Sequence, residues 1–344
     1  MSKRTLFRLL GGIGLVFLVA GPGSAQVITL TLADQNSPAG WGPTNALAPW
    51  VKRVEEATKG KVKIQVYPSQ TLVKGPESWN ALKSGVADMA WCFHGYWADL
   101  TPLADVITLP SLPFKTAEKG SEVLWKLYEK FPAMQREFQD VKVLMLWTSN
   151  PYFLITTKKQ VKTLEDIKGM KIRVTGGPPT EQMKALGGVP TAIPMPDNYM
   201  SLDKGVIDGM AAPWEAIHGF RLYEVAKYYT MVPLSAVYFS MSVNKQKWNS
   251  LPKDVQDAIM SVSGLEGSKF WGRNFFDTAE NGVNERVKAG NHQMTRYVLP
   301  PEEQARWTKI AGEPLWAEWV KRMEGKGRPE AKQVLNAALE LLRN

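Results

Sequence analysis

The sequence predicts an α/β fold made of two lobes, and three observations lead to this prediction. Strand-like and helix-like stretches alternate from residue 27 to residue 91, as in a doubly wound sheet. Two of these stretches recur in the same order in the second half of the chain. About 319 residues remain once an N-terminal leader is removed, and a single hydrophobic core rarely grows that large.

The N-terminus has the pattern of a secretory signal peptide. Three basic residues, Lys3, Arg4 and Arg8, precede an apolar run over 9–20, and small residues follow up to Ala25. The apolar run is too short for a good membrane span, and no other segment approaches that length. We therefore predict a leader over residues 1–25 that is cleaved near Ala25. Its removal lowers the formal charge from +9 to +6.

The first lobe begins with three strands separated by two helices. Residues 27–32 alternate apolar and polar side chains, which is the pattern of a half-buried strand. Gly60 ends the helix that follows, because glycine is favoured just after a helix. The five predicted elements are a strand over 27–32, a helix over 43–57, a strand over 61–66, a helix over 77–83 and a strand over 87–91. Their alternation implies parallel strand pairing.

The same pattern recurs later in the chain. Residues 62–66 are echoed by 170–174, and residues 81–88 are echoed by 201–208. The recurrence indicates two lobes of similar build, each with its ligand-facing loops at the carboxyl ends of its strands. Any two strand–helix units can look alike, however, and the residues alone leave both interpretations open.

The remaining elements connect and cover the lobes. Thr163 begins a capped turn that Gly169 ends and that delivers the chain into the strand at 171–174. From Glu266 onward the pattern is mostly helical, and residues 331–342 carry an apolar face that should dock on a lobe. Between these segments we expect a helix over 118–131, strands over 141–147 and 238–243, and a helix over 252–262.

The predicted lobes are discontinuous in sequence. The N-terminal lobe comprises 26–149 plus about 237–275, and the C-terminal lobe comprises 150–236 plus about 276–344 with the C-terminal helices. No segment looks like a long flexible linker, so short connections between the lobes should act as a hinge.

Charge and motifs argue against several classes of function. Lysines and arginines are mixed with acids, as in 52–56, and form no basic stripe for nucleic acid. No Gly-x-Ser-x-Gly elbow, phosphate loop, His-Glu-x-x-His or Cys-x-x-Cys motif is present in the mature part of the chain. The three histidines are far apart and have no metal-ligand spacing. We therefore expect no nucleic-acid partner, metal, cofactor or catalytic residue; His94 with a nearby acid is the candidate if the protein is an exported enzyme.

The candidate ligand-binding residue is Arg173, in the strand at 171–174. Arginine grips a carboxylate through two parallel hydrogen bonds, although a strand arginine can also simply face solvent. The chain has thirteen tryptophans, and several aromatic residues follow strand ends, where the crevice of an α/β sheet lies. They are Trp91, Phe93, Trp97, Trp147 and Trp214. As a set they favour an aromatic-lined cleft beside Arg173.

Three segments carry a resemblance to a known family. Residues 163–174, residues 197–209 with Tyr199 and the run Lys-Gly-Val-Ile-Asp-Gly, and residues 232–252 resemble the solute-binding subunits of tripartite ATP-independent periplasmic (TRAP) transporters of the DctP type. The resemblance covers essentially the whole mature chain. It implies a two-lobe periplasmic binding protein fold of type II-like build, with an interlobe cleft, hinge strands and a long helix that spans both lobes. It also implies that Arg173 clamps the carboxylate of an organic acid.

Departures from the family pattern concern the rest of the ligand. Sialic-acid-binding members place a glutamate, an arginine and an asparagine where Phe93, Phe153 and Ala212 stand, and the residue that packs on the ligand falls at Met195. Polar groups of a sugar acid would be left unpaired there, at a cost of about 1–3 kcal/mol each. We therefore expect a monocarboxylate with an aromatic or apolar body, enclosed by Phe93, Trp97, Phe153, Met195 and Trp214. His94, Asn150 and Glu215 are candidates for binding a distal hydroxyl or amine.

The resemblance also implies partners and location. The protein would be a periplasmic, non-enzymatic monomer that closes over its ligand and delivers it to a membrane permease. The alternatives are a dicarboxylate or keto acid as the ligand, an exported enzyme, or a protein whose closed form docks on a sensor.

Overall fold

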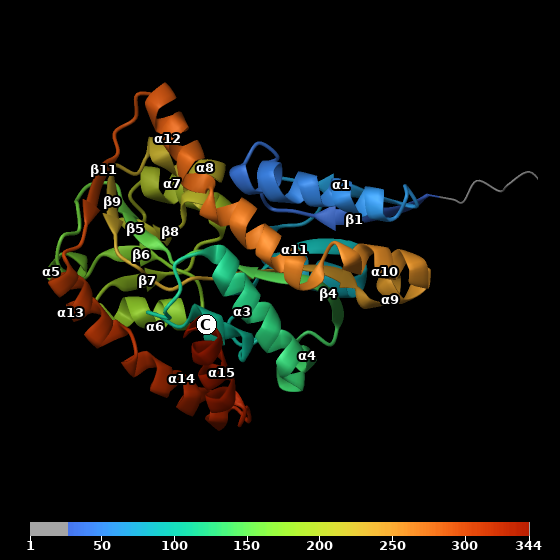
Figure 1. Ribbon diagram of the computed structural model, residues 1–344. Helices are drawn as coiled ribbons and strands as arrows, with labels where there is room; N and C mark the ends of the chain where they lie inside the picture. Colours follow the sequence, from blue (N-terminus) through green and yellow to red (C-terminus); the bar gives the residue numbers. More distant parts are fainter. Residues whose placement is uncertain (1–26, 344) are drawn as a thin grey trace, which may run out of the picture.

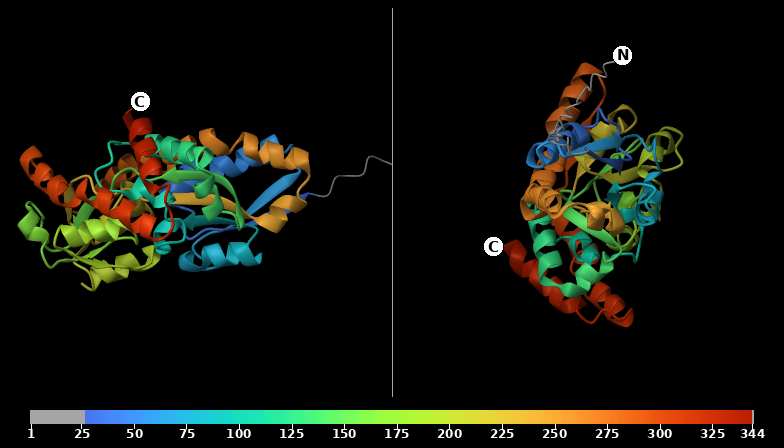
Figure 2. Two further views of the ribbon diagram at one scale, coloured as in Figure 1. Left: turned by 90° about the horizontal axis from the view of Figure 1, so that it is seen from below. Right: turned by 90° about the vertical axis from the view of Figure 1, so that its right-hand side faces the viewer.

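The computed structural model describes residues 27–343, so the predicted leader over 1–25 lies outside the described residues. Two sheets, each with helices around it, form two lobes that lie side by side (Figures 1 and 2). The predicted two-lobe α/β fold is confirmed.

The first sheet has five strands in the order β2-β1-β3-β10-β4. Its strands are β1 (Ile28–Ala33), β2 (Val62–Tyr67), β3 (Met89–Phe93), β4 (Val141–Thr148) and β10 (Tyr238–Asn244). β1 pairs in parallel with β2 and β3, as the alternation of strands and helices predicted. β10 returns from the second lobe and pairs antiparallel with both β3 and β4, placing Phe239 opposite Phe93.

The second sheet has six strands in the order β11-β9-β5-β8-β6-β7. Its strands are β5 (Phe153–Thr156), β6 (Lys171–Arg173), β7 (Val189–Thr191), β8 (Gly209–Ala212), β9 (Tyr228–Met231) and β11 (Thr295–Val298). β6 pairs in parallel with both β7 and β8, and Arg173 lies at its carboxyl end. β5 is antiparallel to both β8 and β9.

Helices cover both sheets. They are α1 (Ala48–Ala57), α2 (Ser78–Ser84), α3 (Ala117–Lys130), α4 (Pro132–Glu137), α5 (Leu164–Ile167), α6 (Pro178–Ala185), α7 (Asn198–Asp203), α8 (Trp214–Gly219), α9 (Lys245–Ser250), α10 (Lys253–Ser261), α11 (Gly264–Trp271), α12 (Ala279–Ala289), α13 (Pro301–Ala311), α14 (Pro314–Gly325) and α15 (Ala331–Arg343). The predicted helices at 118–131, 252–262 and 331–342 correspond to α3, α10 and α15 within one residue at each end.

A long helical run spans both lobes. α11 continues through the π-helical segment Gly272–Asp277 into α12, and Figure 1 shows the run crossing the molecule diagonally in orange. α11 packs on α3 and β4 in the first lobe, whereas α12 packs on α8 in the second. This is the interlobe-spanning helix that the family resemblance implied.

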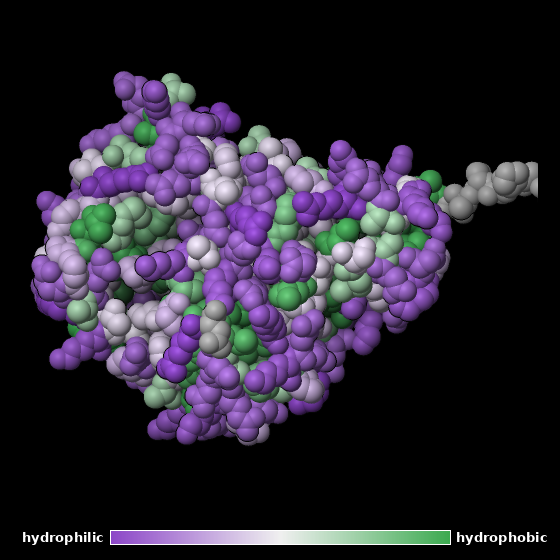
Figure 3. Space-filling model, in the orientation of Figure 1, coloured by the Kyte–Doolittle hydropathy of each residue, from purple (hydrophilic) through white to green (hydrophobic). Residues whose placement is uncertain are grey.

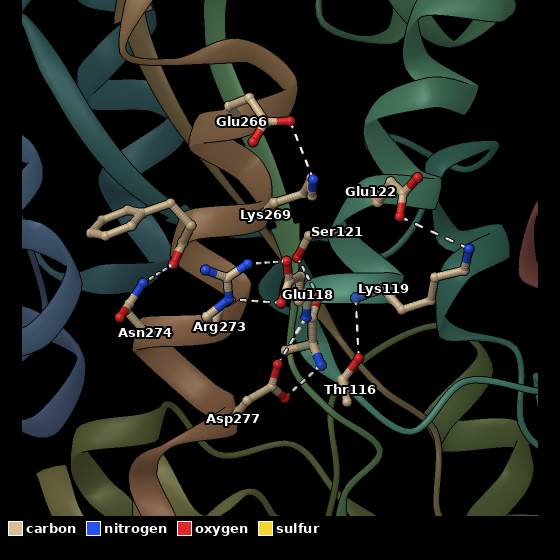
Figure 4. Close-up of polar contacts among 12 residues, drawn as sticks. Thr116, Glu118, Lys119, Ser121, Glu122, Glu266, Lys269, Arg273, Asn274 and Asp277 are labelled. Carbon is tan, nitrogen blue, oxygen red and sulfur yellow. Dashed lines mark hydrogen bonds and ion pairs between the residues drawn. The ribbon is translucent and has the colours of Figure 1, made fainter.

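Polar contacts fasten this run to the start of α3 (Figure 4). The carboxylate of Asp277 accepts hydrogen bonds from the backbone N–H groups of Ala117 (2.7 Å) and Glu118 (3.0 Å). Arg273 forms a two-point ion pair with Glu118. Because the first N–H groups of a helix have no partner within the helix, these contacts stabilise the N-terminus of α3.

Two short segments carry the chain between the lobes. Residues 149–152 lead from β4 to β5, and residues 232–237 lead from β9 to β10. They are hydrogen-bonded to each other, since Ser149 N–H donates to Val237 O at 2.9 Å and Leu234 N–H donates to Tyr152 O at 2.8 Å. Short paired connections of this kind are the hinge strands that the resemblance implied.

The C-terminal helices contact both lobes. α13 and α14 pack on α6, and Glu303 of α13 accepts a hydrogen bond from Leu164 N–H at the start of α5 (2.6 Å). α15 packs on α3 in the N-terminal lobe, although we assigned residues from about 276 to 344 to the C-terminal lobe. The exact lobe boundaries stay a prediction.

The face shown in Figure 3 is mostly hydrophilic, with apolar residues in scattered patches. Among residues 27–343, no helix has the length and apolar character needed to cross a membrane.

Candidate functional site

A cavity lies where the carboxyl ends of strands from the two sheets meet. It is narrow, with about 20 Å³ of internal volume, so a ligand larger than a water molecule requires its walls to move apart. The first lobe lines it with residues that follow β1, with alternate residues of β3, and with one residue each from β10 and the π-helical segment. These are Gln35, Asn36, Trp91, Phe93, Phe239 and Phe276. The second lobe contributes Tyr152, Arg173, Met195, Pro213, Glu215, Ala216 and Phe220.

Arg173 is a buried cation without an anionic partner. Its side chain is 2% exposed, and Nε donates a hydrogen bond to Ile193 O at 3.1 Å. Among the described residues Arg173 forms no ion pair, and the bond from Nε is its only side-chain hydrogen bond. Burial lowers the pKa of Arg173, and the phenol oxygens of Tyr96 and Tyr152 act in the opposite direction. Because a buried unpaired charge is costly, this guanidinium is suited to an incoming anion.

One wall of the cavity is aromatic. Trp91 and Phe93 are two residues apart on β3, so their side chains share one face of the sheet. The Phe239 ring stacks on Phe93 at 5.0 Å, lies 4.8 Å from Trp91, and stacks on Phe276 at 5.2 Å, all between ring centroids. This wall presents ring surface to any ligand that Arg173 holds.

A polar corner completes the cavity. Asn36 donates a side-chain hydrogen bond to Asp34 Oδ1 at 2.7 Å, and Tyr96 donates its phenol proton to Gln35 Oε1 at 2.7 Å. The same phenol oxygen accepts a hydrogen bond from Met195 N–H of the second lobe at 3.0 Å. Tyr96 therefore joins the lobes beside the cavity.

A second, more open hollow of about 370 Å³ lies on the other side of Arg173. It is lined by small or apolar residues of both lobes, among them Gly95, Ala98, Gly176 and Ile193. Gly176 N–H donates to Gly95 O at 3.0 Å, and a side chain at Gly95 would collide with the Phe93 ring. Arg173 thus stands between an outer hollow and the aromatic cavity.

Four of the nine predicted site residues line the aromatic cavity: Phe93, Arg173, Met195 and Glu215. The other five lie elsewhere.

His94 and Trp97 pack inside the first lobe. Both ring nitrogens of His94 are engaged, with Thr101 Oγ1 at 3.1 Å and Ser240 Oγ at 3.0 Å, and its ring stacks on Tyr238. Burial lowers the pKa of His94 to about 3. Trp97 donates its indole N–H to Pro76 O. Neither residue lines the aromatic cavity, and the expectation that they contact the ligand stays a prediction.

Phe153, Trp214 and Asn150 also lie outside the lining of the aromatic cavity. Phe153 packs on Trp214, with ring centroids 4.5 Å apart, inside the core of the second lobe, and Arg296 covers the Trp214 ring. Asn150 is half-buried in the crossing segment after β4. Phe153 lies opposite Ala212 in the β5–β8 pair, so both positions are apolar because they belong to a protein core.

Sequence reasoning missed the two phenylalanines that complete the aromatic wall, Phe239 and Phe276. A signal for Phe239 was available: residues 238–243 were predicted to return to the first lobe, and an antiparallel pairing with β3 places Phe239 beside Phe93. Phe276 carried no such signal, since the π-helical turn that presents it cannot be read from helical periodicity.

No group of three or more potential metal ligands (His, Cys, Asp or Glu) occurs within residues 27–343. Tyr152 and Asn36 contribute polar atoms to the lining of the aromatic cavity.

Comparisons with known proteins agree with this architecture. The family described as bacterial extracellular solute-binding protein, family 7 (DctP), matches residues 35–322. The C4-dicarboxylate-binding periplasmic protein DctP of Rhodobacter capsulatus is 26% identical over 90% of this chain and 92% of its own length.

Two solved structures are similar over 92% of this chain and 98% of their own length, each with 27% identity. One is a TRAP solute-binding protein of Rhodoferax ferrireducens with copurified benzoate, at a TM-score of 0.86. The other is a TRAP solute-binding protein from a marine metagenome, described as specific for aromatic acid ligands and crystallised with 3-hydroxybenzoate, at a TM-score of 0.85.

Proposed function

This chain belongs to bacterial extracellular solute-binding protein family 7, the DctP type of TRAP solute-binding protein, and we propose that it captures an aromatic monocarboxylate. The observation that carries the proposal is the buried, unpaired guanidinium of Arg173 at the edge of an aromatic-walled cavity. A carboxylate would satisfy the free guanidinium nitrogens through charge-assisted hydrogen bonds, and a ring would pack between Phe93, Phe239 and Met195.

The apolar wall disfavours a second charged group on the ligand. Phe153 and Ala212 lie outside the cavity lining. The apolar wall consists instead of Trp91, Phe93 and Phe239. A dicarboxylate would place an anion against these rings without a second cation, and leaving buried polar groups unpaired costs about 1–3 kcal/mol each. A dicarboxylate or keto acid is therefore the less favoured ligand.

The broader role follows from the family. We propose that residues 1–25 direct export and are removed, that the mature protein acts in the periplasm as a monomer without enzymatic activity, and that it delivers its ligand to the membrane permease of a TRAP transporter. The proposed ligand contacts are Arg173 with the carboxylate and Phe93 and Met195 with the ring, whereas His94, Trp97, Asn150, Phe153 and Trp214 are supporting residues.

Calorimetry of the mature protein tests the carboxylate clamp. Benzoate is compared with benzamide, which has nearly the same shape but no charge. We expect benzoate to bind and benzamide to bind at least 100-fold more weakly, because charge-assisted hydrogen bonds are lost. Arg173→Ala should abolish benzoate binding, and Arg173→Lys should restore only part of it, because lysine cannot form the two-point contact.

Arg306→Lys serves as the matched control, since Arg306 is half-exposed on α13 and forms ion pairs with Glu165 and Glu303. It should bind benzoate like the original protein. Equal affinity for benzoate and benzamide, or unchanged benzoate binding by Arg173→Ala, would disprove the clamp. Mass spectrometry of ligand released from the freshly purified protein provides an independent check, with an aromatic acid as the expected species.

A further inference from the structure

Two buried carboxyl groups, one from each lobe, are close enough to influence each other electrostatically, and one of them lines the aromatic cavity. Glu215 stands at the start of α8, lines the cavity and is 4% exposed. Asp34 directly follows β1 and is 2% exposed. Oε1 of Glu215 and Oδ2 of Asp34 are both buried without a hydrogen-bond partner among the described residues. Buried polar atoms normally have partners, and the Glu215 oxygen belongs to a residue that lines the cavity, so a ligand there can supply the missing partner.

Arg173 lines the same cavity as Glu215, but no cation among the described residues is a cause of the pKa shift of either acid. Burial is the main cause that raises the pKa of Glu215, to about 8, and the charge of Asp34 raises it further, whereas the Gly42 backbone N–H acts in the opposite direction. Burial likewise raises the pKa of Asp34 to about 7, against the hydrogen bonds from Asn36 and the Gln35 backbone. Burial thus favours the protonated form of both groups. A protonated carboxyl offers one O–H donor and one carbonyl acceptor.

The segments that carry the two acids touch each other. A side chain at Gly40, six residues after Asp34, would lie 3.6 Å from the Gly219 backbone, and a side chain at Gly219 would lie 3.4 Å from Glu215 Oε1. Glu215 therefore sits where the loop after β1 meets α8, with Asn36 and Gln35 beside it in the cavity lining. Such a position is formed only when the lobes are together.

We propose that Glu215, supported by Asp34 from the opposite lobe, binds a hydroxyl group on the ligand. This proposal rests on the proposed function, that is, on an aromatic monocarboxylate as the ligand. The preferred ligands are then hydroxylated aromatic monocarboxylates. Their carboxylate binds Arg173, their ring packs on Phe93 and Phe239, and their hydroxyl donates to and accepts from the Glu215 carboxyl group.

The chemistry of the pair favours a hydroxyl over charged groups. A second carboxylate on the ligand would lose its hydration at this corner without a cation there to pair with it. An ammonium group requires an ionised carboxylate, whereas burial favours the protonated form of both acids. A neutral hydroxyl pairs with a protonated carboxyl as both donor and acceptor, so neither partner is left unsatisfied.

Calorimetry at pH 6 tests this selectivity with the mature protein. Benzoate carries no second polar group. 3-Hydroxybenzoate and 4-hydroxybenzoate add a hydroxyl at two different positions. 3-(Aminomethyl)benzoate adds an ammonium group, and isophthalate adds a second carboxylate. We expect at least one hydroxybenzoate to bind 10-fold or more tightly than benzoate, and the ammonium and dicarboxylate probes to bind more weakly than benzoate. The result does not depend on a variant that must fold.

Variants then assign the selectivity to the pair. Glu215→Leu should reduce the ratio of hydroxybenzoate to benzoate affinity to about 1 while benzoate still binds, because the apolar side chain removes both the donor and the acceptor. Glu215→Gln should keep part of the ratio, since its amide also donates and accepts. Glu56→Gln is the matched control, because Glu56 is exposed on α1, and it should leave the ratio unchanged.

The outcomes separate the two proposals. If no aromatic acid binds, the proposed function itself fails. If benzoate binds as tightly as both hydroxybenzoates, or if Glu215→Leu keeps the full ratio, the hydroxyl contact is wrong and the carboxylate clamp stands. Tighter binding of the ammonium or dicarboxylate probe would show that the pair recognises a charge instead.

Discussion

Replacing Arg173 by methionine should have opposite effects on ligand binding and on the stability of the free protein. Methionine has a similar length and no charge, so Arg173→Met removes a buried cation that has no protein anion to neutralise it. Replacement of a buried ion pair by apolar side chains of similar volume has stabilised other proteins by about 1–4 kcal/mol, and an unpaired buried cation lacks even the attraction of such a pair. The lost hydrogen bond from Nε to Ile193 O opposes this by about 1 kcal/mol.

The expected net effect on the free protein is therefore between about 0 and 3 kcal/mol of added stability. Unfolding entropy near the midpoint is about 2.1 cal/mol/K per residue, so for about 320 residues 1 kcal/mol corresponds to roughly 1.5 °C in Tm. The Tm of the ligand-free variant should accordingly stay unchanged or rise by up to about 5 °C. In the original protein, an acid at 100 times its Kd should add about 2.7 kcal/mol, or roughly 4 °C. This ligand-induced shift should vanish in Arg173→Met.

Differential scanning calorimetry with and without benzoate measures both effects. Arg306→Met is the control, because it removes a half-exposed arginine with two glutamate partners; it should lower the Tm slightly and keep the ligand-induced shift. The reasoning is refuted if ligand-free Arg173→Met melts at a lower temperature than Arg306→Met, since the guanidinium would then stabilise the free protein. It is also refuted if Arg173→Met keeps the full benzoate shift.

Three further predictions concern parts of the fold that support the site. Asp277→Ala should lower stability by about 1–2 kcal/mol, measured by urea denaturation, because the first two N–H groups of α3 lose their acceptor; an unchanged midpoint would contradict the capping role. Burial raises the pKa of Asp105 from 3.8 to about 8, against the hydrogen bond from Tyr238. Its protonated form therefore stabilises the fold fully below about pH 4, and this contribution is lost as the pH rises through 8. Asp105→Asn should flatten the fall of Tm between pH 5 and 9, and an equally steep fall would argue against the shift. His94→Gln should reduce stability by about 1–3 kcal/mol without changing the Kd of benzoate more than twofold, because His94 bonds Thr101 and Ser240 and does not line the cavity; a tenfold loss of affinity would restore His94 to the ligand site.

Local patterns were sufficient to predict much of the first lobe. Strand alternation located β1, β2 and β3, and helical periodicity located α3 and α15. The antiparallel strands β5 and β10 break the expected parallel order, because pairing depends on contacts between segments distant in sequence. The short strands β7 and β11 have three and four residues, too few for alternation to stand out.

The sequence alone did not predict which side chains point into the cavity. Arg173 and Phe93 each stand at the end of a strand, and both line the aromatic cavity; their contact with a ligand stays a prediction. Trp97 and Trp214 were selected as aromatic residues that follow strand ends, but the sequence does not fix which way a side chain points after its strand. Phe153 was selected from the family resemblance. Phe153 and Trp214 both pack on Tyr229 in the core of the second lobe.

The division of the site between the lobes explains how a ligand can drive closure. The cation, Arg173, comes from the second sheet, whereas three of the four rings of the aromatic wall, Trp91, Phe93 and Phe239, come from the first. A ligand that touches only one lobe gains only one of these contacts. Its affinity for the closed form therefore exceeds its affinity for the open form by the contacts of the other lobe, and this difference is the free energy available to shift the population. Direct contacts between the lobes beside the cavity include the hydrogen bonds from Met195 to Tyr96 and from Gly176 to Gly95. Each such bond contributes only about 1 kcal/mol net, so a ligand that bridges the lobes adds to a modest direct attraction between them.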